Sequence, residues 1–208
     1  DFKRHPHDPL LSDITADSDS NAKEGVHNFG PVKTTEDDWE NGTPDRSRTV
    51  IINQNYTHSS GTLGVDKLIV KEGKRLSVDN QLLLVTNDIN IETDAEIRLI
   101  GTSQLIQTHK EESKVTGDGK IYIDRASDLE SVFRYNFMSS PVTTNSDKDK
   151  YTVFSAFKDG TKALDATSIA GVKIARDIEF IGNWNGSPYN PESENPSLKI
   201  SNRWIHTF

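Results

Sequence analysis

Apolar residues recur in closely spaced pairs along residues 63–123. Within most pairs the spacing is two residues, as in Leu63 with Val65 and Ile89 with Ile91, so both side chains point to one face of a strand. Successive pairs mostly follow one another after six to eight residues. The gaps carry turn-forming residues, among them Asn80, Gly101 and Gly117. No window keeps the 3.6-residue period of a helix, so the pattern predicts a run of very short β-strands.

Two all-β architectures are compatible with short, evenly spaced strands. A sandwich of hairpins uses longer strands and two-residue turns, whereas a β-solenoid uses very short strands that turn corners and stack coil upon coil. Many strands here span only three residues, and primed hairpin turns are rare between them. The pattern therefore favours a short β-solenoid. Its coils need caps, and Trp39, just before the β-forming run Thr49–Ile52, is expected to cover the open end of the core.

Changes in residue character divide the chain into three parts. Residues 1–35 hold few large apolar side chains and are expected to form an extended or disordered linker. Residues 36–126 form the β-solenoid with its N-terminal cap, and residues 127–208 are expected to form a β-sandwich-like domain that is incomplete.

The C-terminal part is expected to contain strands at residues 151–157, 178–184 and 198–208. The last strand places Trp204 and Phe208 on one face, and the chain stops within that strand. A strand face of this kind needs a neighbour. Trp204 and Phe208 are therefore the candidate partner-binding residues, and the partner is expected to be the remainder of a parent chain or a protein of the export or attachment machinery.

Composition excludes several classes of protein. The net charge of -8 opposes binding to nucleic acids and anionic membrane surfaces. The absence of cysteine rules out disulfide scaffolds, thiolate metal sites and cysteine nucleophiles. No apolar segment approaches the roughly 20 residues of a membrane-spanning helix.

Several longer motifs resemble one known group of proteins. WENGTPD (39–45), GTSQLIQTH (101–109), GDGKIYIDR (117–125), RYNFMSSPV (134–142) and RWIHTF (203–208) occur in this order. Together they resemble the C-terminal region of large Bacteroidetes surface proteins exported by the type IX secretion system, including the mobile adhesins of gliding flavobacteria. The resemblance covers residues 36–208. It implies an extracellular, outer-membrane-associated location and a role in export, attachment or display. Such regions normally continue into further β-structure that ends in the secretion signal, which is not identified here.

One segment matches part of a calcium-binding loop. Asp17, Asp19 and Asn21 follow the alternate-residue ligand spacing of such a loop. The glycine expected next is Ala22, and the distal glutamate position holds Asn28. A solvated acidic linker is therefore preferred, with Ca²⁺ as the alternative and no other cofactor expected.

Carbohydrate chemistry is the main alternative to a structural role. Polysaccharide lyases and glycosidases need paired carboxylates, or a carboxylate with a base, on an exposed face. The acidic residues of the solenoid, such as Asp94 and Asp118, lie mainly in turns, where bonding to the backbone is their ordinary use. The sequence therefore predicts a non-enzymatic part of a surface adhesin. The alternative is a carbohydrate-binding module or polysaccharide-acting enzyme, for which Trp184 and Tyr189 are the candidate ligand-binding residues and surface polysaccharide is the partner.

Overall fold

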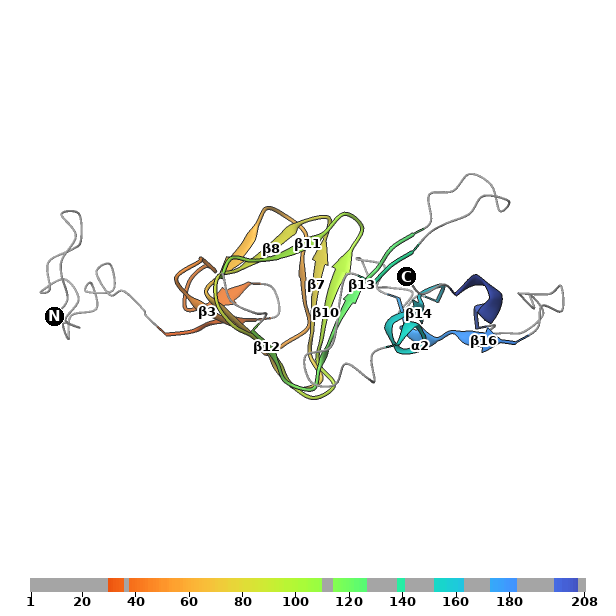
Figure 1. Ribbon diagram of the computed structural model, residues 1–208. Coiled ribbons are helices and arrows are strands. Elements are labelled where there is room, and N and C mark those ends of the chain that lie inside the picture. Colours follow the sequence, from red (N-terminus) through yellow and green to blue (C-terminus); the bar gives the residue numbers. More distant parts are fainter. Residues whose placement is uncertain are drawn as a thin grey trace, which may run out of the picture.

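The computed structural model describes residues 30–35, 38–109, 114–126, 138–140, 152–162, 173–182 and 197–205. Almost all regular structure in these residues is β, and the centre of the chain winds into a short β-solenoid (Figure 1). The predicted all-β class and the solenoid are both confirmed.

The solenoid has three faces, each built from one strand per coil. The first face contains β1 (Val32–Thr34), β2 (Trp39–Glu40), β3 (Thr49–Ile52), β6 (Lys67–Val70), β9 (Ile89–Ile91) and β12 (Val115–Thr116). The second contains β4 (Tyr56–His58), β7 (Arg75–Asp79), β10 (Glu96–Ile100) and β13 (Lys120–Ile123), and the third contains β5 (Leu63–Val65), β8 (Leu82–Val85) and β11 (Gln104–Gln107). Every pairing within these sheets is parallel except that of β1 with β2.

Strand register explains the spacing seen in the sequence. Leu68 lies opposite Ile89, and Leu76 lies opposite Ile97, so the central coil takes 21 residues. Three strands in such a coil require a strand about every seven residues, which agrees with the six to eight residues that separate successive apolar pairs in the sequence. The other coils take between 18 residues, from Val50 to Leu68, and 26 residues, from Ile89 to Val115.

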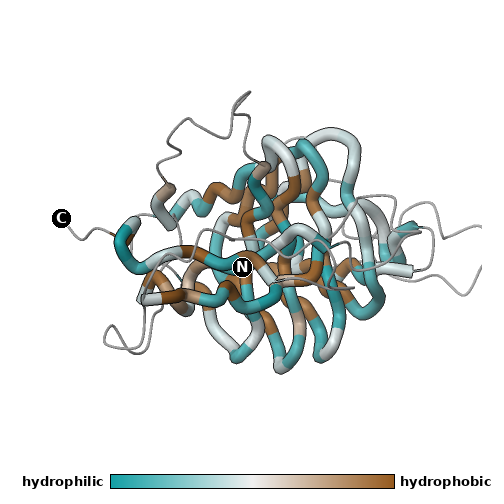
Figure 2. The backbone as a smooth tube through the Cα atoms, turned by 90° about the vertical axis from the view of Figure 1, so that its right-hand side faces the viewer, coloured by the Kyte–Doolittle hydropathy of each residue, from teal (hydrophilic) through white to brown (hydrophobic). Residues whose placement is uncertain are grey.

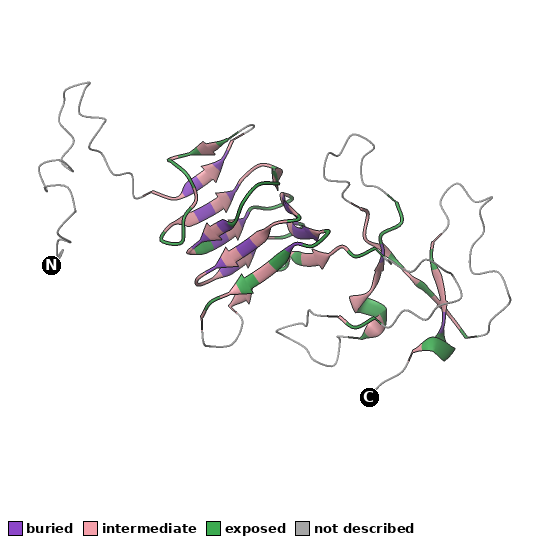
Figure 3. Ribbon diagram, turned by 90° about the horizontal axis from the view of Figure 1, so that it is seen from above, coloured by how far each residue is buried: buried purple, intermediate pink, exposed green. Residues whose placement is uncertain are grey.

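The core is a stack of aliphatic side chains from the inward face of every coil. Buried residues alternate with less buried ones along strands such as β3, β5 and β9, and Figure 3 shows the buried residues as bands across the strands. Hydrophobic segments recur from coil to coil in Figure 2. In β7 and β10 three successive residues are buried. The largest fully buried side chains are Ile52, Leu68, Leu76, Leu83, Ile89, Ile91, Ile97 and Leu99. A two-residue period is therefore sufficient to close the interior of each coil.

The N-terminal end of the solenoid is capped. β2 runs antiparallel to β1, and Trp39 packs against the core with its ring 4.6 Å from that of Tyr56. The buried Thr34 hydroxyl donates to Asn53 Oδ1 and accepts the backbone N–H of Asn53 and Gln54. β1 precedes residue 36, so the ordered sheet includes residues that the sequence assigned to the linker.

The C-terminal region adds two small sheets beyond the solenoid (Figure 1). Its elements are α2 (Val153–Ala156), β14 (Lys158–Asp159), β15 (Arg176–Asp177), β16 (Glu179–Ile181), β17 (Lys199–Ser201) and the 3₁₀-helix η3 (Asn202–Trp204). β14 pairs antiparallel with β15, and β16 pairs parallel with β17. β16 lies where a strand was predicted at residues 178–184.

Two predictions of C-terminal strands are wrong, because polar side chains cap short helices in these segments. The prediction for residues 151–157 is wrong, because the Thr152 and Ser155 side chains exchange bonds with each other's backbone N–H and form a capping box for α2. The long final strand is also wrong. β17 ends at Ser201, whose hydroxyl accepts the Arg203 N–H and begins η3. Trp204 is 58% exposed and does not share a strand face with Ile200.

Candidate functional site

Among the predicted site residues, only Trp204 lies in the part of the chain that the structure describes. Trp204 lies on the exposed side of η3. Six others lie outside the described residues: Asp17, Asp19, Asn21, Trp184, Tyr189 and Phe208. Those predictions remain untested. Among the described residues, one open hollow lies on the solenoid itself.

The feature begins with a shortened corner between the first and second faces. In the coil of β9 and β10, Ile89 precedes the inward residue Ile97 by eight residues. In the next coil Val115 occupies the register of Ile89, and Ile121 occupies that of Ile97. These two residues are only six apart, so the last corner is two residues shorter than the one on which it stacks.

Two glycines allow the short corner to fit against the preceding coil. A Cβ on Gly119 would lie 2.2 Å from Ile91 Cγ2 and 2.6 Å from the carbonyl oxygens of Ala95 and Glu92. A Cβ on Gly117 would lie 2.0 Å from the Ile91 carbonyl oxygen. The Gly119 N–H donates to that same oxygen at 2.9 Å. The corner is thus recessed, and it leaves a step in the surface.

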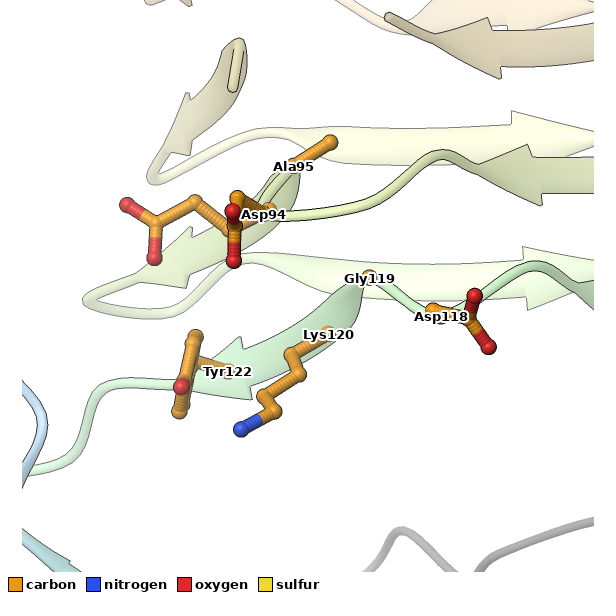
Figure 4. Close-up of a pocket in the computed structure, with 7 residues that line it drawn as sticks. Asp94, Ala95, Asp118, Gly119, Lys120 and Tyr122 are labelled. Carbon is orange, nitrogen blue, oxygen red and sulfur yellow. The ribbon is translucent and has the colours of Figure 1, made fainter. Parts of the chain in front are cut away.

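The step forms an open hollow of about 160 Å³, shown in Figure 4. We call it the corner hollow and define it by Asp94, Glu96, Asp118, Lys120 and Tyr122. Asp94 and Glu96 belong to one coil, and the other three residues belong to the next. The hollow therefore combines carboxylates, one amine and one phenol ring across two stacked coils.

Arg98 neutralises part of this charge and holds the Tyr122 ring. Its side chain is only 4% exposed and pairs with Glu96 at 3.2 Å and with Asp124 at 3.1 Å. Its guanidinium carbon lies 4.0 Å from the Tyr122 ring centroid, which is a cation–π arrangement. Arg75 also approaches Glu96 at 3.7 Å. Glu96 is therefore charge-balanced, while Tyr122 has a fixed neighbour on one side.

The other polar groups of the hollow remain available to a ligand. In the part of the chain that the structure describes, the side chains of Asp94, Asp118 and Lys120 make no hydrogen bond or ion pair. The interpretation of these two aspartates as backbone-bonded turn residues is thus not supported. Lys120 acts at longer range on Asp177, whose pKa is lowered by the hydrogen bond and charge of Lys158 and, more weakly, by the charge of Lys120.

Metal binding is not favoured at the hollow. Among the described residues, no three His, Asp or Glu side chains are grouped so that they could hold a metal ion. The helices described in the structure are also too short and too polar to cross a membrane. What the hollow offers is a set of hydrogen-bond donors and acceptors beside an aromatic ring.

A second polar cluster, in the C-terminal region, is structural. The Asp159 carboxylate is fully buried and accepts bonds from the N–H and hydroxyl of Thr161, from Arg176 Nη2 and from the Leu198 N–H. Burial raises the pKa of Asp159, but the hydrogen bonds and the Arg176 charge outweigh it, so the pKa lies below its ordinary 3.8. One carboxylate therefore joins β14, β15 and the start of β17.

The fold defines a short, capped β-solenoid with an open polar hollow at its last corner. A family model described as a domain of unknown function, DUF8693, matches residues 33–162, and the chain belongs to this family. The match begins within β1 and ends after β14, so it includes the whole solenoid except Val32. Comparison with curated proteins and with solved structures found no match.

Proposed function

We propose that this chain is a non-enzymatic scaffold within a cell-surface adhesin that is exported by the type IX secretion system. In this role it holds attachment surfaces outside the cell and resists deformation. The resemblance of residues 36–208 to the C-terminal regions of such proteins supports the route of export. The solenoid supports the mechanical role.

The observation that carries the proposal is the use of outward charges between coils. Lys67 pairs with Asp88 at 3.2 Å, and Lys71 pairs with Glu92 at 2.6 Å, in each case joining one coil to the next. On the second face, Arg98 joins β10 to Asp124, which follows β13. Each exposed pair contributes less than about 1 kcal/mol, but a series of them restrains sliding between coils. Carboxylates held in this way fasten the scaffold and are poorly placed for general acid or base work.

Export is tested in cells. The parent protein, carrying an epitope tag beside residues 1–208, is expressed in a host with a functional type IX system and in a matched strain lacking it. We expect added protease to remove the tag from intact cells of the first strain only. Equal protection of the tag in both strains would contradict the proposal.

The absence of catalysis is tested with the purified chain. Incubation with a panel of neutral and acidic polysaccharides should release no reducing ends and no unsaturated products. Sustained release that is lost after Asp118→Asn would instead establish the alternative, a polysaccharide-acting enzyme, at the corner hollow.

A further inference from the structure

We propose that the corner hollow binds one neutral hexose unit of a polysaccharide. This inference deepens the proposed adhesive function by naming a ligand class for the surface, and it rests on that function for the source of the polysaccharide. The site is distinct from Trp184 and Tyr189, the aromatic residues that the sequence offered for carbohydrate binding.

The hollow is preformed by the backbone. Its depth comes from the corner that is shorter by two residues and from Gly119, whose Cα lies against Ile91 and Ala95. The Gly119 and Lys120 N–H groups bond to the coil above at 2.9 and 3.0 Å. A site that is formed before binding does not lose affinity to the ordering of loops.

Its size matches a small ligand. About 160 Å³ is less than the roughly 300–1,000 Å³ of pockets for drug-sized molecules. A single sugar ring suits this space, and the open side lets neighbouring units of a chain extend into solvent. Asp94, Asp118 and Lys120 lie at that open, exposed side.

The chemistry of the lining matches hydroxyl groups. Carboxylates such as those of Asp94 and Asp118 accept hydrogen bonds from hydroxyls, and the Lys120 ammonium donates up to three. Tyr122 adds a ring and a phenol, and its ring is already held by Arg98 at 4.0 Å. A hexose, whose hydroxyls both donate and accept, satisfies donors and acceptors together.

Charge selects against acidic sugars. Glu96 is balanced by Arg98 and Arg75, which leaves two carboxylates, Asp94 and Asp118, against one ammonium, Lys120. A uronate would place its own carboxylate beside these groups, and like charges at short range repel. The hollow therefore favours neutral hexoses over uronic acids.

The test uses the purified 208-residue chain labelled with ¹⁵N. Cellotetraose, maltotetraose and mannotetraose are titrated separately, with tetragalacturonate as the acidic comparison. At least one neutral oligosaccharide should shift the amide signals of residues 118–122, with a dissociation constant on the order of 1 mM. Tetragalacturonate should leave them unchanged.

Two variants and a matched control locate the site. Lys120→Ala and Asp118→Ala should each weaken binding about tenfold without lowering the melting temperature, because both side chains are exposed and unbonded. Lys74→Ala is the control, because Lys74 directly precedes Arg75, which holds the register of Lys120 two coils earlier, and Lys74 does not line the hollow. It should bind as the unmodified chain does.

The proposal is overturned if no neutral oligosaccharide shifts these signals at concentrations on the order of 10 mM. Unchanged binding by Lys120→Ala, or preferential binding of tetragalacturonate, would overturn it equally. Surface exposure is measured separately in cells, so loss of binding with export intact refutes the sugar site alone. Export failure with sugar binding intact refutes the proposed location alone.

Discussion

Substitution of two glycines separates steric crowding from backbone strain at the corners of the solenoid. At Gly119 a Cβ would lie 2.6 Å from two carbonyl oxygens, and backbone atoms cannot move aside cheaply. Gly119→Ala should therefore cost about 3 kcal/mol, the upper part of the usual range for overpacking. At Gly73 no atom lies within 4 Å of the added Cβ, but φ is +64°. Gly73→Ala should cost only about 1 kcal/mol, the penalty of the left-handed conformation.

The two costs are measured by urea unfolding and by thermal unfolding, each monitored by circular dichroism and by tryptophan fluorescence. For a domain of the size of the solenoid (residues 32–123), 1 kcal/mol corresponds to roughly 4–8 °C in melting temperature. The solenoid of Gly119→Ala should therefore melt at least about 10 °C below that of the unmodified chain. Gly73→Ala should melt about 5 °C below it. If Gly119→Ala were as stable as Gly73→Ala, the recessed corner and the hollow that depends on it would be wrong.

Four further substitutions, one of them a control, test other parts of the structure. Ile97→Ala should lower the free energy of unfolding by about 2–5 kcal/mol in chemical denaturation, because Ile97 is fully buried. Ile106→Ala, at a 42% exposed position, should lower it by less than about 1 kcal/mol. Equal losses in the two variants would contradict the register. Arg98→Lys should lower the melting temperature by several degrees because an ammonium cannot serve Glu96, Asp124 and the Tyr122 ring together, and an unchanged melt would show that the network contributes little. Asp159 has a lowered pKa, so its stabilising effect is complete above about pH 3.8 and is lost as the pH falls below that value. The Leu198 amide donates to this carboxylate, so its protection factor, the intrinsic exchange rate at the same pH divided by the observed rate, should fall in that acidic range. In Asp159→Asn the protection factor should already be low at neutral pH, and full protection in the variant would refute the role of the carboxylate.

The solenoid was predictable because each coil repeats one local rule. Pairs such as Leu76 with Val78 and Ile97 with Leu99 show the two-residue period directly, and stacking preserves it from coil to coil. The role of Trp39 as an end cap also followed from its place before the first strong strand. The number of faces did not follow, because a step of about seven residues fixes strand spacing but not the angle at each corner.

The corner hollow was missed because its cause is a difference between coils. Asp94 and Asp118 each look like ordinary turn residues when their segments are considered separately. The signal was the interval from Val115 to Ile121, which is two residues shorter than that from Ile89 to Ile97. Aligning the coils would have revealed it. The predictions of the C-terminal strands failed for another reason. Thr152 and Ser201 cap short helices, and the β-forming residues beside them made these segments look like strands in the sequence.

The 21-residue length of the central coil indicates one way in which the length of this protein can change. Leu68 and Ile89 occupy equivalent places on the first face, and Leu76 and Ile97 do so on the second. Duplication of residues 68–88 would therefore add a complete coil whose strands meet partners of the same kind above and below. Each added coil would lengthen the rod by about 4.8 Å, the spacing between neighbouring strands. Coils of other lengths also stack in register where their corners differ, as Val50 with Leu68 and Ile89 with Val115 show. A gain or loss of 63 bases at this point would therefore change the distance between the two ends of the rod by one coil, while the packing of the neighbouring coils stays the same.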